Sequence, residues 1–262
     1  MKFRKIFLVI GLIICLCVTG FYFYIQPKYV VPVLMYHHID EKGKTSTLSV
    51  SPENFRRQMR FLSSHNYNVI SLAEFVQAIR NQTILPRNTV VITFDDGYDD
   101  NYYLAYPVLK KYTLPATVFV IVDAIGKEGY LNYKQIKEMA SWGIIDIGSH
   151  SLSGGYLPGL STRELEREIG ISKVILQAQL NKGIDYFCYP IGGFTPQMQE
   201  ILKNFGYKGA CTTNRGKSQT YLNNDLFALK RIKIKDGFPN LFVFRVKLSG
   251  YYNFFRRVRN PF

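Results

Sequence analysis

The N-terminal segment holds the longest apolar stretch of the chain. The basic residues Lys2, Arg4 and Lys5 precede an uncharged run from Phe7 to Ile25. At about 1.5 Å of rise per residue, a helix of about 20 residues approaches the roughly 30 Å hydrocarbon core of a bilayer. The pattern predicts a membrane-spanning helix over residues 7–25, in contact with lipid. The basic flank is expected in the cytoplasm and the remainder of the chain outside it.

A cleaved signal peptide is the alternative interpretation of this segment. The run is long for the apolar region of a signal peptide, and it lacks a clear Ala-x-Ala cleavage site. Phe21, Tyr22 and Tyr24 suit the outer interface between lipid and water, where aromatic rings are favoured. We therefore expect residues 1–29 to form an uncleaved anchor in the cell membrane and residues 30–262 to form one extracytoplasmic domain.

From Val30 onward, short apolar runs alternate with amphipathic segments. The apolar runs predict strands, and several of the other segments open with a Ser cap and an early acidic residue, as helices do. Predicted strands cover residues 30–36, 89–94, 116–122, 144–148, 185–189 and 207–213, and predicted helices cover residues 52–64, 71–79, 102–112, 133–142, 161–180 and 196–205. The alternation indicates a parallel sheet covered by helices, and the number of units favours a closed or nearly closed barrel over an open sheet.

Charge and composition narrow the range of partners. The 262 residues include 33 Lys and Arg against 19 Asp and Glu, a formal net charge of +14 at pH 7, and a hydrophobic fraction of 47% that excludes a largely disordered chain. A positive charge of this size favours anionic lipid, wall polymers or nucleic acid. Because the basic residues are dispersed and the domain is expected to be exported, we expect no nucleic-acid partner. The basic aromatic tail at residues 254–259 is expected either to touch the membrane surface or to be solvated.

The four cysteines fall into two pairs. Cys15 and Cys17 lie in the apolar run, and Cys188 and Cys211 lie in two predicted strands. No cysteine or histidine cluster has zinc-finger spacing. Four buried thiols are the simplest interpretation, and a disulfide between Cys188 and Cys211 would require the two strands to be neighbours.

Ionisable residues follow the predicted strands. Asp95 and Asp96 end one strand, His150 follows another, and His37 follows the first. Parallel barrels carry their chemistry at the C-terminal ends of strands. Two adjacent carboxylates are costly to ionise without a nearby positive charge, which a metal would supply, although Asp-Asp-Gly can also be a simple turn. A histidine at a strand end can be a general acid, a metal ligand or a packing residue.

Three segments, in this order, resemble the motifs of the polysaccharide deacetylases, carbohydrate esterase family 4. They are TFDDG at residues 93–97, GSHS at 148–151 and YPIG at 189–192. VPVLMYHHI near the start and FLSSHNYNVISLAEF at residues 61–75 resemble a bacterial branch of this family with an early Tyr-His motif. The resemblance covers nearly all of residues 30–235. It implies an α/β fold, a distorted (β/α)7-type barrel, and metal-dependent hydrolysis of N-acetyl groups on a sugar polymer.

The resemblance also implies a metal centre. Asp95 matches the general base, whereas Asp96 and His150 match two metal ligands. The expected cofactor is a divalent metal, with Zn²⁺ as the first choice. A divalent metal lowers the pKa of bound water and polarises a carbonyl group, which suits the hydrolysis of an unreactive amide.

Three further residues acquire roles from the resemblance. His37, in Tyr36-His37, matches the general acid that protonates the leaving amine in this branch, with His38 as a less suitable choice. The backbone N–H of Tyr189 matches the oxyanion donor. Arg231 matches an arginine that supports the acid–base pair in relatives.

The chain departs from the family pattern in three respects: the late catalytic histidine of a Leu-x-His motif is absent, and the other two departures concern a metal ligand and an arginine. The third ligand should be a histidine at position 154, where this chain has Gly154, and Cys188 stands where the family has an arginine before Tyr-Pro. Catalytic zinc sites normally have three protein ligands, so a two-ligand site should hold the metal more weakly. A hydroxyl such as that of Ser151, another carboxylate or additional water could fill the gap.

Three functions remain open at this stage. The first is an N-deacetylase of a cell-wall polysaccharide or exopolysaccharide. The second is a non-catalytic glycan-binding relative that lost turnover with the third ligand. The third is an O-acetyl esterase with the same site, since an acetyl ester is easier to hydrolyse than an amide.

Overall fold

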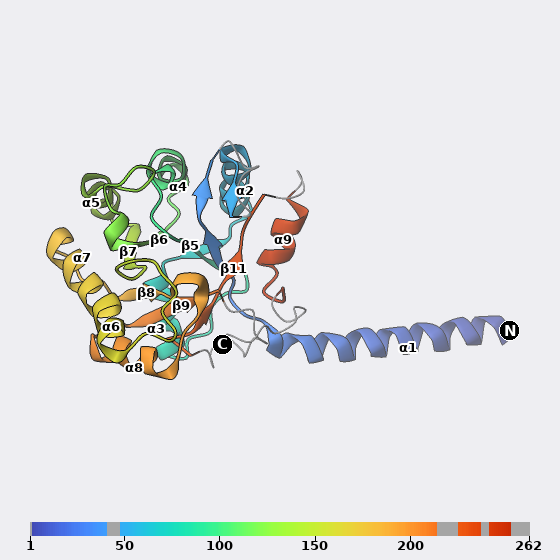
Figure 1. Cartoon of the computed structure of the whole chain (residues 1–262). Helices are drawn as coiled ribbons and strands as arrows, with labels where there is room; N and C mark the ends of the chain where they lie inside the picture. Colours follow the sequence, from blue (N-terminus) through green and yellow to red (C-terminus); the bar gives the residue numbers. More distant parts are fainter. Residues whose placement is uncertain (1, 41–47, 214–224, 237–240, 253–262) are drawn as a thin grey trace.

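The computed structural model describes residues 2–40, 48–213, 225–236 and 241–252 (Figure 1). The helices are α1 (Lys2–Ile25), α2 (Pro52–Ser64), α3 (Leu72–Arg80), α4 (Tyr106–Tyr112), α5 (Tyr133–Ser141), α6 (Thr162–Glu166), α7 (Ser172–Leu180), α8 (Pro196–Asn204) and α9 (Phe242–Leu248). The strands are β1 (Val33–Tyr36), β2 (His38–Ile39), β3 (Ser49–Val50), β4 (Asn68–Ile70), β5 (Thr89–Phe94), β6 (Ala116–Val120), β7 (Ile145–Ser149), β8 (Tyr186–Cys188), β9 (Gly209–Thr212), β10 (Leu229–Lys230) and β11 (Ile232–Lys233).

The main sheet is a nearly closed parallel barrel. Within the described residues its strand order is β10-β9-β8-β7-β6-β5-β1-β11, with β4 added beside β5, and every pairing is parallel. Only Arg231 separates β10 from β11 in the chain, so the two ends of this path meet in one segment. With β10 and β11 taken as that one segment, the path has seven strands, and the barrel predicted from sequence is confirmed.

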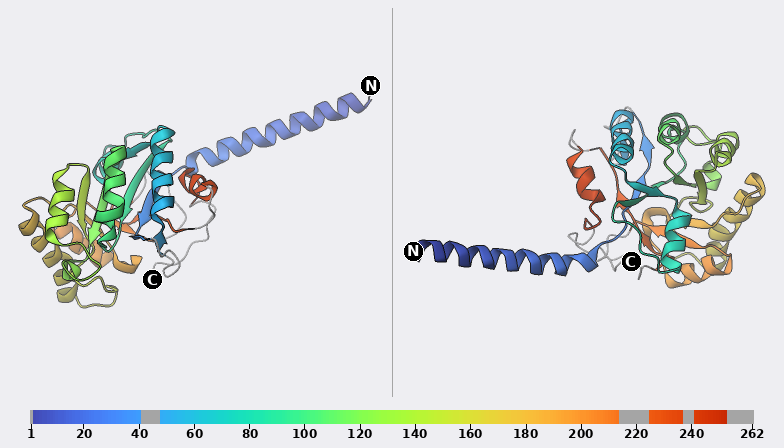
Figure 2. Two further views of the ribbon diagram at one scale, coloured as in Figure 1. Left: turned by 90° about the horizontal axis from the view of Figure 1, so that it is seen from above. Right: turned by 180° about the vertical axis from the view of Figure 1, so that it is seen from behind.

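Helices lie around the outside of the barrel and cover the outer face of its strands (Figure 2). Every residue of β1, β5 and β6 is buried, which explains why these strands read as continuous apolar runs. Capping residues fix where helices begin. For example, the Ser71 side chain accepts a hydrogen bond from the backbone of Glu74, whose side chain reciprocates.

Most predicted elements are present, with local differences. The helix predicted over residues 161–180 is divided by a π-helical turn (Arg167–Ile171), and the helix predicted from residue 102 begins with another (Asn101–Ala105). The short strands β2, β3, β4, β10 and β11 were not predicted, because two or three residues show no periodicity of their own.

Helix α1 projects away from the barrel in every view of Figures 1 and 2. By length and composition, Ile6–Lys28 could cross a membrane, although a signal sequence has the same properties. The helix leads directly into the domain, where the N–H of Val30 donates to the carbonyl oxygen of Gly250 at 2.9 Å. Cys15 and Cys17 are exposed on α1, so the expectation of four buried thiols was wrong for this pair. The basic tail at residues 254–259 lies outside the described residues.

Candidate active site

The C-terminal ends of strands β1, β5 and β7 bring the predicted residues together. His37 directly follows β1, Asp95 and Asp96 follow β5, and His150 follows β7. Asp95 and His150 are almost fully buried, with exposed fractions of 2% and 4%. These side chains come from segments more than fifty residues apart, and the parallel sheet aligns them because each stands at the same end of its strand.

Asp95 is fixed by Arg231. The guanidinium forms two parallel hydrogen bonds with the carboxylate, Nη1 to Oδ1 at 2.6 Å and Nη2 to Oδ2 at 2.7 Å. Its remaining N–H groups donate to the hydroxyl of Thr93 (3.1 Å), the carbonyl oxygen of Thr212 (3.3 Å) and Sγ of Cys188 (3.0 Å). Burial opposes ionisation of Asp95, but the adjacent guanidinium holds the pKa of this carboxyl well below its usual range. Asp95 is therefore an ionised, rigidly oriented carboxylate.

Asp96 points toward His150 instead. Its backbone has a left-handed conformation (φ +70°), and its Oδ1 lies 3.3 Å from Nε2 of His150. Nδ1 of His150 is hydrogen-bonded to the carbonyl oxygen of Cys188 at 2.8 Å, so Nε2 is the nitrogen available to a metal. Two atoms each about 2.0–2.1 Å from a tetrahedral ion lie roughly 3.3 Å apart. The separation of Asp96 and His150 is therefore compatible with a shared divalent metal.

Tyr98 also contacts the side chain of Asp96, and this contact was not predicted from the sequence. Burial together with the negative charge of Asp96 raises the pKa of the Tyr98 phenol, which also hydrogen-bonds with Asp96 and Tyr130. Its ring stacks on His38, with ring centroids 3.5 Å apart, and Nδ1 of His38 lies 2.7 Å from Oδ2 of Asp100. The position of Tyr98, immediately after TFDDG, is the sequence signal that could have identified it.

Of the two adjacent histidines, His37 faces the carboxylate. Its Nε2 lies 3.8 Å from Oδ2 of Asp95, whereas its Nδ1 is buried and makes no hydrogen bond within the described residues. Burial lowers the pKa of His37, and the negative charge of Asp95 only partly opposes this effect. The lowered pKa keeps this imidazole neutral beside the carboxylate of Asp95. Its buried Nδ1, which lacks a hydrogen-bond partner among the described residues, reduces the stability of the fold.

Tyr189 and Ser151 are both buried beside this group, and each already has a hydrogen-bond partner. The N–H of Tyr189 donates to the carbonyl oxygen of Cys211 at 3.0 Å, so the predicted oxyanion role requires that this N–H share or exchange its partner when substrate binds. The hydroxyl of Ser151 accepts a hydrogen bond from the N–H of Gly154 at 3.0 Å and so closes the turn after His150.

The backbone and the surroundings of position 154, where the expected third ligand is missing, favour glycine. The φ angle of Gly154 is +73°, and an added Cβ would lie 2.6 Å from Cδ1 of Ile121. Both the backbone conformation and the neighbouring side chain therefore oppose any larger residue.

We expect Gly154→His, by itself, not to restore a third ligand. The left-handed conformation and the overlap with Ile121 should destabilise the fold by about 1–3 kcal/mol. Urea unfolding and zinc titration of the variant would measure both effects. Gly155→His is the matched control, because an added Cβ there meets only Oγ of Ser153 at 3.3 Å. Tighter zinc binding by Gly154→His than by wild type would contradict this expectation.

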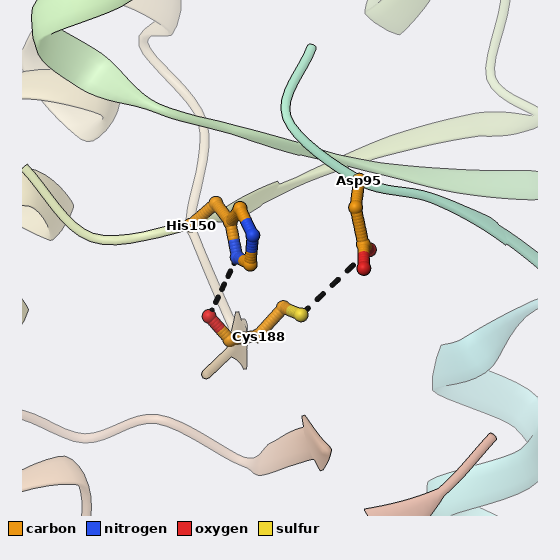
Figure 3. Close-up of side chains that lie close together, drawn as sticks. All are labelled: Asp95, His150 and Cys188. Carbon is orange, nitrogen blue, oxygen red and sulfur yellow. Dashed lines mark hydrogen bonds between the residues drawn. The ribbon is translucent and has the colours of Figure 1, made fainter. Parts of the chain in front are cut away.

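Cys188 adds a thiol to the site (Figure 3). One ligand atom from each of Asp95, His150 and Cys188 lies within 4.8 Å of the other two, and all three residues are buried. Cys188 is directly opposite Cys211 in the pairing of β8 with β9, and both thiols are free. The two strands are thus neighbours, but no disulfide joins them.

Comparison with known proteins gives a consistent result. Residues 83–210 match the family model described as polysaccharide deacetylase. YxkH of Bacillus subtilis (strain 168), named as a polysaccharide deacetylase, is 32% identical over 207 residues, which cover 79% of this chain and 72% of YxkH. A poly-β-1,6-N-acetyl-D-glucosamine N-deacetylase of Staphylococcus aureus (strain MSSA476) is 29% identical over 209 residues, covering 74% and 70% of the two chains. The deacetylase PplD of Streptococcus pyogenes, in complex with acetate, superposes with a TM-score of 0.72 at 33% identity, over 78% of this chain and 92% of PplD.

Proposed function

Because this chain belongs to the polysaccharide deacetylase family, we propose that it removes N-acetyl groups from a cell-wall or exopolysaccharide sugar by metal-assisted hydrolysis. The observation that carries the proposal is the grouping of Asp95, Asp96, His150 and His37 at one end of the barrel. The S. aureus relative is named for poly-β-1,6-N-acetylglucosamine, which makes oligomers of this sugar the first substrate to test.

Each side chain has a role that follows from its surroundings. A divalent metal held by Asp96 and His150 would supply an acidified water and polarise the acetyl carbonyl group. Asp95, ionised beside Arg231, accepts a proton from the attacking water. His37, neutral in the resting site and next to Asp95, takes up the proton that Asp95 removed from water and delivers it as general acid to the departing amine. The products are acetate and the free amine of the sugar.

Acetate release by the full chain in detergent tests the proposal. The protein would first be treated with a chelator and then assayed on N-acetylglucosamine oligomers and peptidoglycan fragments, with and without Zn²⁺ or Co²⁺. Metal-dependent release supports the proposal. Oligomer binding without any release would instead favour the glycan-binding alternative, which rests on Gly154. Release from an O-acetylated sugar alone would favour the esterase.

We expect His37→Gln to lower acetate release by about 100-fold, at the lower end of the usual contribution of a general acid. The amide cannot take up a proton and pass it to the departing amine as an imidazole can, although it retains much of the shape of the side chain. His38→Gln is the comparator, because His38 contacts Tyr98 and Asp100 rather than Asp95. The kinetics of both variants should be measured on one substrate. If His38→Gln lowers acetate release more than His37→Gln does, His37 is not the general acid.

We also propose that α1 is an uncleaved membrane anchor that holds the domain, residues 30–262, outside the cytoplasm. Support comes from the length and apolar composition of Ile6–Lys28 and from the basic residues before it. The chain is expected in the membrane fraction at its full mass of 30.2 kDa, with its domain open to protease added outside spheroplasts. A soluble, shortened product would show that the segment is a cleaved signal.

A further inference from the structure

We propose that Asp95, His150 and Cys188 form a binding site for a thiophilic divalent cation, distinct from the Asp96–His150 pair and competing with it. This inference rests on the proposed metal-assisted function only in that both sites share His150. The new site would be occupied by an ion such as Zn²⁺ or Co²⁺, because a thiolate ligand favours these ions over Mg²⁺, Ca²⁺ or Mn²⁺.

The distances leave room for an ion at bonding range. Three atoms within 4.8 Å of one another share a point no farther than about 2.8 Å from each (4.8 Å divided by √3), and Zn²⁺ binds sulfur at about 2.3 Å and nitrogen or oxygen at about 2.0–2.2 Å. Sγ of Cys188 is already 3.7 Å from Oδ1 of Asp95. Figure 3 shows the imidazole of His150 and Sγ of Cys188 both facing the carboxylate of Asp95. Small side-chain movements would therefore complete the coordination.

Hydrogen bonds hold these ligands in place. The bond between Nδ1 of His150 and the backbone of Cys188 orients Nε2, as an outer partner of a metal-bound histidine does. Arg231 donates to both Asp95 and Sγ of Cys188 and so fixes their relative positions. Burial raises the pKa of the Cys188 thiol, so a bound ion must displace the thiol proton.

The charges of the buried group balance when an ion is bound to the thiolate. Asp95, Asp96 and a Cys188 thiolate carry three negative charges, and Arg231 carries one positive charge, which leaves −2. A divalent cation brings the sum to zero. With a neutral thiol the same group would hold a net charge of +1 around the ion, which is costly inside a protein. Binding would release the thiol proton to solvent.

The proposed site offers three protein ligands, whereas the pair of Asp96 and His150 offers two because position 154 is glycine. Zinc sites normally use at least three protein ligands, so a thiophilic ion should prefer the set that contains Cys188. An ion held there engages Asp95, the proposed base. At saturating Zn²⁺, acetate release is therefore expected to be slower in wild type than in Cys188→Ser.

Cobalt spectroscopy tests the site directly. A Co²⁺–thiolate bond has a sulfur-to-metal charge-transfer band in the near ultraviolet, whereas nitrogen and oxygen ligands do not. The full chain in detergent, reduced and kept free of oxygen, would carry Cys15→Ala, Cys17→Ala and Cys211→Ser. Cys188 is then the only cysteine. The matched control carries Cys15→Ala, Cys17→Ala and Cys188→Ser and so retains only Cys211, which is equally buried and directly opposite.

Titration of the protein that retains Cys188 with Co²⁺ should produce the charge-transfer band. Adding Cys188→Ser should abolish it and weaken cobalt binding by at least about tenfold, since loss of an outer partner alone costs about 10–100-fold. Cobalt binding without the band would overturn the thiolate site while leaving the Asp96–His150 metal intact. Absence of cobalt binding would overturn the thiolate site, and acetate release without added metal would then decide separately whether the proposed function also fails. The presence or absence of the charge-transfer band is measured on the protein that retains Cys188. The proposal can therefore be tested even if Cys188→Ser misfolds.

Discussion

Replacing Asp95 by Asn is expected to reduce acetate release by about 10³–10⁴-fold, the upper part of the range that a general base contributes. The amide occupies nearly the same volume but cannot accept the proton of water. It also leaves the buried guanidinium of Arg231 facing a neutral group, so the side chain at position 95 is held less firmly in its orientation. Steady-state kinetics with the preferred metal would measure the loss.

Stability must be measured on the same variant. Asp95→Asn removes a charge that pairs with Arg231, so some loss of stability is expected, and kinetics should be measured well below the melting temperature. Asp185→Asn is the control, because Asp185 forms an exposed ion pair with Lys208 away from the site. If Asp95→Asn stays folded and releases acetate at a rate close to that of wild type, Asp95 is not the base.

Replacing Arg231 by Met is expected to destabilise the protein by about 3–5 kcal/mol, because a buried carboxylate then lacks its counter-charge. Asp95 would lose both strong hydrogen bonds, and its pKa would rise from its present low value as burial is no longer opposed. Acetate release near neutral pH should therefore fall as well. Urea unfolding of wild type and variant measures the first effect.

Two companion variants separate charge from geometry. Arg231→Lys keeps the charge but not the paired N–H groups, so it should recover only part of the stability. Arg231→Met combined with Asp95→Leu removes both charges and should recover most of it, because a buried ion pair replaced by apolar groups is often neutral. The double variant should remain inactive. If Arg231→Met alone were as stable as wild type, the pair would have no net structural role.

The amino-acid sequence is sufficient to predict the barrel and the strand ends at which chemistry could occur. Alternation of apolar runs with capped helices predicts a parallel fold, and TFDDG and GSHS place Asp95, Asp96 and His150 at strand ends. These properties are local, because periodicity and caps are read over a few residues. The same reasoning placed His37 at the end of the first strand, and the structure brings it next to Asp95.

The hydrogen bonds, ion pairs and packing contacts of those residues are visible only in the folded structure. Arg231 is 136 positions from Asp95 and reaches it because the last strand segment closes the barrel. The thiol of Cys188 accepts a hydrogen bond from the guanidinium of Arg231, which lies between β10 and β11. Ile121 lies against Gly154, so the position of the missing ligand cannot simply accept a histidine. Such contacts depend on strand register and on the packing of distant side chains, and neither leaves a periodic signal in the sequence.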